Sequence, residues 1–405
     1  MSCQKRVQPV ASEIIPRGWR GIWLRIQPWV AVFDGPFILF FLGIAFLSTI
    51  TLYSAGNDFD GRFTGHIRNL GIAVLIMWLV AHLPPGMIHR VAVPLFVLGV
   101  VLLLAVALFG DVSKGARRWL NIGITRIQPS ELMKIAMPMM LAWLVHRVEG
   151  LRTFQHWLIA VLLLMVPTAF ILAQPDLGTA ILVFSAGLFV LFFAGLPWRL
   201  VLVALGIGVL GVLLLIVFGD AACADGVNWP GLREYQRQRV CTLLDPMRDP
   251  LGKGFHIIQS IIAVGSGGIF GKGWMQGTQT HLEFIPERTT DFLFAAYSEE
   301  FGLLGNLLLL SLYAGLILRG LWIAIGAPTL FSRLLAGAIS LTIFNYAFVN
   351  MGMVTGVLPV VGVPLPWMSY GGTAMVTLGF GAGILMSIAR TRSQTVQGFV
   401  LQRSA

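Results

Sequence analysis

Charged residues are scarce in this sequence. Of its 405 residues, 11% are Asp, Glu, Lys or Arg, whereas 57% are hydrophobic. Soluble domains carry about 25% charged residues, so this chain lacks the polar groups that would cover a water-facing surface. Cysteine is also rare, with three residues, too few for a disulfide scaffold. These shortages exclude a soluble enzyme, a disordered chain and a disulfide-stabilised domain, and they leave a polytopic membrane protein.

Long apolar runs take the place of the missing charge. A bilayer core of about 30 Å is crossed by about 20 residues of α-helix, so each run of this length predicts one membrane-spanning helix. We therefore predict an all-α polytopic membrane protein with about ten transmembrane helices. The runs lie at 35–54, 69–84, 91–110, 130–146, 155–173, 177–195, 198–218, 299–325, 333–356 and 372–390.

The net charge of +10 has an explanation that needs no nucleic acid partner. Basic residues gather in both terminal segments and after the second, fourth, sixth and eighth runs, and cytoplasmic segments are enriched in Lys and Arg. We expect residues 1–33 to form a cytoplasmic extension, 34–395 the ten-helix domain and 396–405 a cytoplasmic tail. The first run is too long for a signal peptide, so we expect it to be retained.

Two connections on the opposite side depart from this charge rule. The segment 111–129 carries Lys114, Arg117, Arg118 and Arg126 against Asp111 alone. The segment 219–290, between predicted helices 7 and 8, balances seven basic with seven acidic residues. An unstructured loop of about 70 residues is uncommon, so we predict a large structured extracytoplasmic loop. Within it, residues 255–264 form a short amphipathic pattern that could lie at the membrane interface.

A glycine-rich stretch in this loop resembles a phosphate-binding loop. The run G-S-G-G-I-F-G-K-G occupies residues 265–273. The phosphate-loop pattern would need a glycine in place of Ser266 and a Ser or Thr in place of Gly273. We therefore interpret the stretch as a close-packed turn.

Three helices are predicted to begin on the extracytoplasmic side beside an acceptor side chain. Their starts read Q-P-S-E at 128–131, Q-P-D-L at 174–177 and T-T-D-F at 289–292. Such residues cap helices. Helix N-termini also carry about half a positive charge and attract anions. With Arg117, Arg118 and Arg126 nearby, both capping and a site for a phosphate-bearing ligand remain open.

Acidic side chains within or beside apolar runs also have two interpretations. Glu131 and Lys134 lie one turn apart and share a helix face, either as an ion pair that fixes helices together or as the wall of a substrate cavity. Asp291 is either an N-cap, which would lower its pKa, or a general base, which needs a pKa near ambient pH.

Three further features carry weaker signals. Cys223 and Cys241 share the large loop and can pair if the compartment is oxidising. His281 could join Glu283 or Glu287 at a metal, but the spacing matches no known metal site, which favours a polar loop residue. Residues 357–367 are uncharged and rich in proline, so they should re-enter the protein or line a cavity.

Five ordered segments resemble the SEDS family of bacterial cell-wall proteins. They are G-A-R-R-W-L (115–120), Q-P-S-E-L-M-K (128–134), Q-P-D-L-G-T-A (174–180), L-E-F-I-P-E-R-T-T-D-F-L-F (282–294) and L-P-V-V-G-V-P-L-P-W-M-S-Y-G-G-T (358–373). The variants G-F-H-I-I-Q-S (254–260), P-E-R and G-V-P-L-P are similar to the elongation-type (RodA) branch rather than the division-type branch.

This resemblance implies a peptidoglycan glycosyltransferase of the bacterial inner membrane that polymerises lipid II. Its implied partners are a class B penicillin-binding protein and other membrane proteins of the elongation complex. The family's critical carboxylate corresponds to Asp291, a second important acid to Glu283, and the cavity ion pair to Glu131 and Lys134. The resemblance also implies substrate-binding roles for Arg117, Arg118, Asp176 and Thr179. Thr289 replaces the usual His, so no role is given to a His before the aspartate.

On this basis Asp291 is expected to be the general base, with Glu283 raising its pKa or orienting the acceptor. Cationic side chains would stabilise a diphosphate leaving group, with Mg²⁺ or Mn²⁺ as an optional further charge and no organic cofactor. A lipid II flippase or other lipid transporter and a pure scaffold are the rivals. An alternating-access carrier should show comparable polar features on both sides, whereas here they gather on one.

Overall fold

The computed structural model describes residues 31–403 except 57–58, 60, 114–115, 122–125, 225–226, 228, 230–233, 253 and 286. Most of the predicted N-terminal extension, the last two residues and Lys114 therefore lie outside the described residues. The side chains of Arg117 and Arg126 lie outside them as well.

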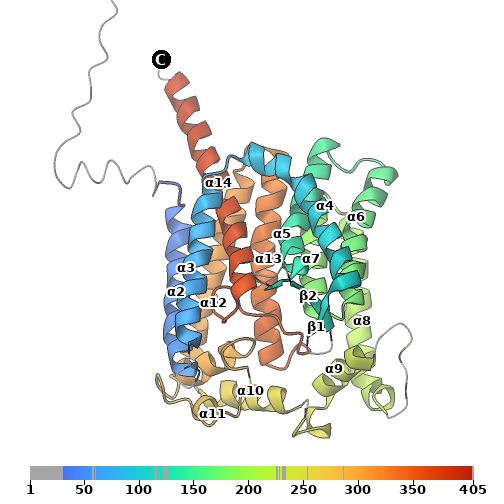
Figure 1. The fold of residues 1–405 in the computed structure, drawn as a ribbon, viewed down its shortest axis with the longest axis vertical. Helices are drawn as coiled ribbons and strands as arrows, with labels where there is room; N and C mark the ends of the chain where they lie inside the picture. The colour runs from blue at the N-terminus through green and yellow to red at the C-terminus, as the bar shows by residue number, and fades with distance from the viewer. Residues whose placement is uncertain are drawn as a thin grey trace, which may run out of the picture.

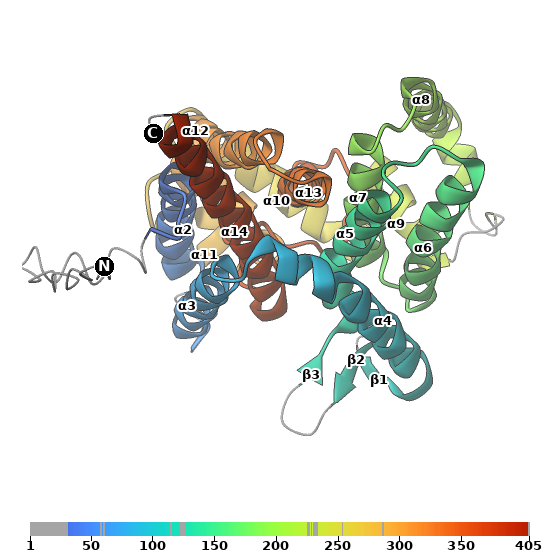
Figure 2. The same cartoon turned by 90° about the horizontal axis from the view of Figure 1, so that it is seen from above.

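All ten apolar runs form helices of one bundle (Figures 1 and 2). They are α2 (Gly35–Ala55), α3 (Arg62–Ala81), α4 (Pro85–Phe109), α5 (Pro129–Arg147), α6 (Phe154–Ala173), α7 (Leu177–Phe193), α8 (Trp198–Ala222), α12 (Leu293–Ile325), α13 (Leu330–Val354) and α14 (Gly372–Arg403). Eight are long and apolar enough to cross a membrane. Because α5 and α7 are not among these eight, the polytopic helical fold is confirmed, while ten crossings remain a prediction.

Helix α13 lies at the centre of the bundle. It contacts α5, α7, α12 and α14, while α14 packs along α3 and α12 along α2. At the α3–α14 contact, a Cβ on Gly379 would lie 2.5 Å from the carbonyl oxygen of Ala73. Small residues of this kind allow membrane helices to approach closely. Helix α8, by contrast, has one buried residue, Gly219, and stands at the edge of the bundle (Figure 2).

The segment after α4 adds a small sheet to the predicted helical fold. Strands β1 (Asp111–Ser113), β2 (Ala116–Asn121) and β3 (Arg126–Ile127) form a small antiparallel sheet in the order β1-β2-β3. Val112 pairs with Arg117, and Leu120 pairs with Ile127. The segment was predicted only as a charged connection, because strands of two to six residues leave no readable alternation.

The long loop is structured, as predicted. It contains α9 (Glu234–Leu244), the 3₁₀ turn η1 (Pro246–Arg248), α10 (Phe255–Ser266) and α11 (Thr278–His281). These elements lie at one end of the bundle, here called the loop end, and the C-terminus of α14 lies at the opposite end (Figure 1). Helix α10 packs one face on α12 and α13, and Ser260 donates to the carbonyl of Val354. Cys223 and Cys241, whose pairing the sequence left open, form a disulfide that ties the end of α8 to α9.

The glycine-rich stretch packs against a break in α12. Gly302 has φ 63° and ψ −159°, and the amides of Leu303 and Leu304 donate to Gly268 and Ile269. Lys272 donates to Glu299 at 2.6 Å instead of being available for a phosphate. The interpretation of this stretch as a close-packed turn is therefore confirmed.

We predict that Gly302→Ala destabilises the protein. The conformation of Gly302 is almost restricted to glycine and costs other residues about 1–3 kcal/mol, and an added Cβ would lie 2.3 Å from the amide of Gly271. Thermal unfolding in detergent should show a lower Tm. Gly208→Ala in α8 is the matched control, because nothing lies within 4 Å of a Cβ there. Equal Tm values for the two variants would contradict this account of the break.

Candidate functional site

Asp176 connects three segments at the loop end of the bundle. It is the N-cap of α7, where its Oδ1 accepts from the amide of Thr179 at 3.2 Å. Its Oδ2 accepts from Gln128 Nε2 at 3.1 Å and lies 3.9 Å from Arg118 Nε, while Arg118 Nη2 donates to the carbonyl of Pro175 at 2.7 Å. The predicted helix cap is confirmed. The cap also holds strand β2 and the start of α5 against α7.

The predicted ion pair lies inside the protein. Lys134 Nζ donates to Glu131 Oε1 at 2.6 Å, and the two residues are 3% and 8% exposed. The ammonium group also lies 5.0 Å from the ring centroid of Tyr346 on α13. The pair therefore links α5 to α13, as the helix-fixing interpretation requires.

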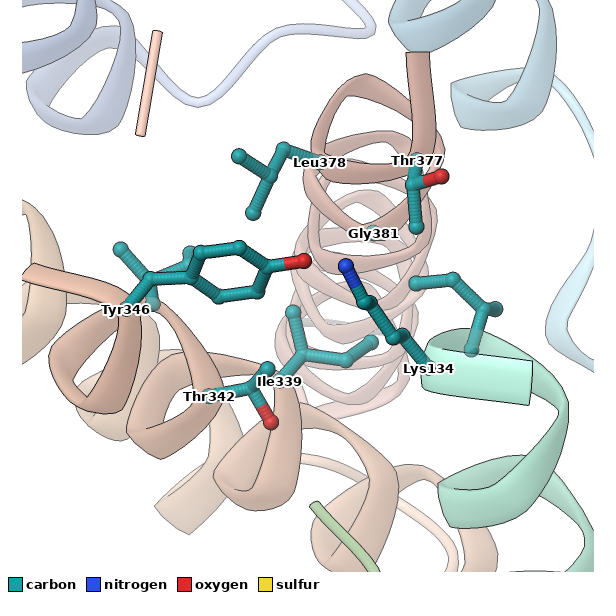
Figure 3. A pocket seen from close by; sticks show the side chains of 9 residues that line it. Lys134, Ile339, Thr342, Tyr346, Thr377, Leu378 and Gly381 are labelled. Atoms are coloured by element: carbon teal, nitrogen blue, oxygen red, sulfur yellow. The ribbon is translucent and has the colours of Figure 1, made fainter. Parts of the chain in front are cut away.

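Not every polar atom around this pair is satisfied. Glu131 Oε2 and the hydroxyl of Tyr346 are buried and have no hydrogen-bond partner. Figure 3 shows the Tyr346 hydroxyl and the Lys134 amine pointing toward each other across a cavity of about 20 Å³. Such a cavity has room for about one water. The substrate-wall interpretation of the pair therefore stays open.

Asp291 is not a helix cap. Helix α12 begins at Leu293, its N-cap is Phe292, and no side chain caps it, so the capping alternative is wrong. Asp291 is partly buried in the preceding turn, where its carbonyl accepts from Asn350 Nδ2 at 2.9 Å. A Cβ on Gly362 would lie 3.4 Å from Asp291 Oδ2. The side chain therefore faces the irregular segment that follows α13.

That irregular segment re-enters the protein, as the prolines predicted. Val361, Val363, Leu365, Trp367 and Met368 are buried. Asn350 Nδ2 donates to Val363 as well as to Asp291, and Tyr313 donates to Pro366. The turn that holds Asp291 is thus fixed by α13 and by this segment together.

Glu283 lies in a different environment. Its side chain is 68% exposed, and Glu283 Oε1 lies 3.5 Å from Arg288 Nη2. Arg288 is buried and donates through Nε to the carbonyl of Ala55. The contact that the structure gives Glu283 is therefore with Arg288, and its influence on Asp291 stays a prediction.

Arg239 on α9 is a site residue that the sequence analysis missed. Partial burial lowers the pKa of its guanidinium. The charge of Arg118 lowers this pKa as well, whereas Tyr235, Asp176 and Asp291 raise it. Arg239 is thus within electrostatic range of two predicted site acids and one predicted site arginine. We call Arg118, Asp176, Arg239 and Asp291 the charged cluster. In the sequence, nothing distinguishes Arg239 from the other basic residues of the loop.

His256 lies beside the turn that holds Asp291. Its ring stacks on Phe292 with centroids 5.8 Å apart. Burial lowers its pKa, and the charge of Glu287 opposes that effect. His256 was not singled out from the sequence either.

Metal-binding side chains do not gather in the described part of the chain, where no three His, Cys, Asp or Glu residues are placed to hold an ion. His281 is the last residue of α11, and its Nε2 lies 3.9 Å from Glu300 Oε1. A Mg²⁺ bound together with substrate phosphates needs only one or two carboxylates, which Asp176 and Asp291 could supply.

The fold and the charged cluster together define a polytopic membrane protein with a polar site at one end of its bundle. The model of the FtsW, RodA and SpoVE cell cycle proteins matches residues 32–394, so the chain belongs to this family.

Relatives and solved structures agree with this assignment. The chain is 49% identical over 356 residues to the peptidoglycan glycosyltransferase MrdB of Escherichia coli K12, covering 88% of this chain and 93% of the relative. It is 30% identical to the peptidoglycan glycosyltransferase RodA of Treponema pallidum, covering 89% and 98%. The crystal structure of Thermus thermophilus RodA superposes with a TM-score of 0.66 at 27% identity, over 90% of this chain and 99% of that one. A chain from a peptidoglycan synthase complex that coordinates polymerisation and crosslinking gives 0.73 at 31%, over 90% and 100%.

A double-mutant cycle on the ion pair should show strong coupling in stability. Lys134→Met leaves a buried carboxylate unpaired and should cost about 3–5 kcal/mol, whereas combining it with Glu131→Leu should restore much of that loss. Thermal unfolding in detergent measures the stability of the single variants and of the double variant. If the two single losses simply add, the pair does not fix the helices. If the double variant is stable but inactive, the pair serves the reaction as well.

Proposed function

We propose that this protein is a peptidoglycan glycosyltransferase that polymerises lipid II into glycan strands during cell elongation and the maintenance of rod shape. Lipid II is a disaccharide-pentapeptide carried on undecaprenyl diphosphate. The proposal is supported by the family, by the activity named for the E. coli relative, and by the charged cluster at the loop end. The cluster is the observation that carries it, because this chemistry needs an acid and cations at one membrane face.

The reaction is a single displacement at the anomeric carbon of the donor. The acceptor hydroxyl oxygen forms the new glycosidic bond and passes its proton to the Asp291 carboxylate. The bond between the anomeric carbon and the diphosphate oxygen breaks, and undecaprenyl diphosphate leaves with the electron pair. Inversion at this carbon converts the α-linked donor into a β-linked product.

Cations that face the leaving group are the second requirement. Guanidinium groups bind phosphate oxygens through paired, charge-assisted hydrogen bonds, and this suits Arg118 and Arg239 to the departing diphosphate. Asp176 orients Arg118, because it lies 3.9 Å from the guanidinium and is itself fixed as the cap of α7. Thr179 contributes its backbone amide to that cap, and Arg117 belongs to the same strand as Arg118. A divalent cation, Mg²⁺ or Mn²⁺, would add charge at Asp176 or Asp291.

We place the protein in the bacterial inner membrane with the loop end outside and both termini in the cytoplasm. The end opposite the loops carries a series of arginines, as cytoplasmic ends do. They are Arg90, Arg147, Arg152, Arg199, Arg319, Arg333, Arg390 and Arg392. This orientation puts the charged cluster where lipid II is polymerised.

A class B penicillin-binding protein is the proposed partner, together with other membrane proteins of the elongation complex. The structural neighbour from a complex that coordinates polymerisation and crosslinking supports such a partner. The partner would cross-link the strands that this chain makes.

Asp291→Asn should abolish glycan synthesis while leaving the fold intact. The amide keeps the size of the side chain but cannot accept the hydroxyl proton, so we expect a loss of at least about 100-fold. The measurement is polymer length from purified lipid II by the complex with its transpeptidase blocked. Glu287→Gln, an exposed acid of the same loop, is the control. Wild-type rates for Asp291→Asn would exclude Asp291 as the base. If the wild-type complex made no polymer but transferred lipid II across vesicle membranes, the result would favour the flippase or transporter hypothesis.

Arg239→Gln should slow polymerisation by about 10- to 100-fold, because one charge is lost from the leaving-group site. Arg237→Gln on the same helix is the matched control, since Arg237 pairs with Glu234. Arg239→Lys should retain part of the activity. Equal effects of the Arg239→Gln and Arg237→Gln changes would show that α9 acts only through its fold.

A further inference from the structure

An apolar groove opens between α7, α12 and α13 at the end of the bundle opposite the loops. Its volume is about 700 Å³, and its walls include Phe193, Leu321, Ala324 and Leu334. Phe193 and Leu321 are partly exposed, whereas Ala324 and Leu334 are buried. The groove is far from the charged cluster, and the proposed reaction does not use it.

The length of the groove matches one leaflet of a membrane. Its lining residues on α13 run from Leu330 to Leu341, which is eleven residue steps and about 17 Å at 1.5 Å per residue. A bilayer core is about 30 Å thick, so the groove extends through about half of it. An acyl chain fits this length, whereas a membrane-spanning helix of another protein would need a groove through both leaflets.

A single cationic side chain lies near the end of the groove where α13 begins. Arg333 is the charged residue among the lining side chains, it lies in the first turn of α13, and it is exposed. Its side chain makes no ion pair or hydrogen bond with another described residue. Two tryptophans mark the level of the membrane interface nearby: Trp198, whose ring packs on Phe192 of the groove wall at 5.4 Å, and Trp322, which is exposed on α12.

We propose that this groove is a binding site for an anionic phospholipid. The acyl chain lies between α12 and α13, and Arg333 binds the phosphate of the headgroup. Basic residues beside grooves between membrane helices select anionic headgroups in this way. In the orientation proposed above, the site lies in the cytoplasmic leaflet. The lipid would fill the surface between α7 and α12 that α8 leaves uncovered.

The test is native mass spectrometry of the delipidated full-length protein, titrated with phosphatidylglycerol or with phosphatidylethanolamine of the same chains. The wild type should bind phosphatidylglycerol more tightly. Arg333→Gln should weaken that binding about tenfold and remove the preference, because a charged hydrogen bond is lost. Arg333→Lys should keep most of it. Leu321→Trp, which fills the groove, should weaken both lipids.

Arg147→Gln is the matched control, because it removes an exposed arginine from the same end of the bundle without touching the groove. It should leave lipid binding unchanged. Equal affinity of the wild type for the two lipids, or equal losses for Arg333→Gln and Arg147→Gln, would overturn the proposal. Efficient disulfide cross-linking of Val203→Cys with Leu321→Cys in native membranes would also overturn it, since α8 would then occupy the groove.

Discussion

The cost of burying charge in an apolar bundle determines how the loop end of this protein is built. Buried carboxylates are tolerated when donors surround them. Glu299 is fully buried and accepts from Lys272, from the hydroxyls of Thr278 and Thr280, and from two backbone amides. Because those donors lie in the loop, satisfying this one carboxylate fixes the loop against α12. Gly267 and Gly271 permit this contact between the loop and α12, because their backbones lie directly against that of the helix.

The same requirement is visible in how the acids of the candidate site are held. Asp176 is satisfied by a backbone amide, Gln128 and Arg118, so its charge is used in positioning. Asp291 lies just before its helix, and Phe292 occupies the capping position. Glu131 is intermediate, because one oxygen binds Lys134 while the other has no partner.

Much of this arrangement could be predicted from the sequence. The apolar runs identified the helices, the prolines of 357–367 identified the re-entrant segment, and the i, i+3 spacing identified the Glu131–Lys134 pair. These features depend on local composition, which a sequence displays directly. Asp176, Asp291 and Arg118 were identified from helix starts and loop charge, and the family motifs assigned their roles.

The remaining features depend on contacts between distant segments. The break at Gly302 exists because the loop at Gly268 and Ile269 takes over its hydrogen bonds. Arg239 comes within electrostatic range of the other cluster charges because α9 lies at the loop end, where the Cys223–Cys241 disulfide ties it to the end of α8. The start of α12 differs by one residue from what the pattern T-T-D-F suggested, because Phe292 and not Asp291 is the N-cap. This small shift moves Asp291 out of the capping position, and Asn350 and the re-entrant segment fix the turn that holds it.

The distribution of polar groups between the two ends argues for chemistry at one membrane face. The charged cluster lies at the loop end, whereas the other end carries the pair of Arg319 with Asp34, 2.7 Å apart, and an apolar groove with one arginine at its rim. A carrier must present its ligand to both faces in turn, and its polar surface has to reach both. Between the two ends, the Glu131–Lys134 pair of α5 packs against Tyr346 of α13 beside a cavity with room for about one water. A lipid-linked sugar can therefore react at the loop end while its tail stays in the bilayer, without any part of it crossing the protein.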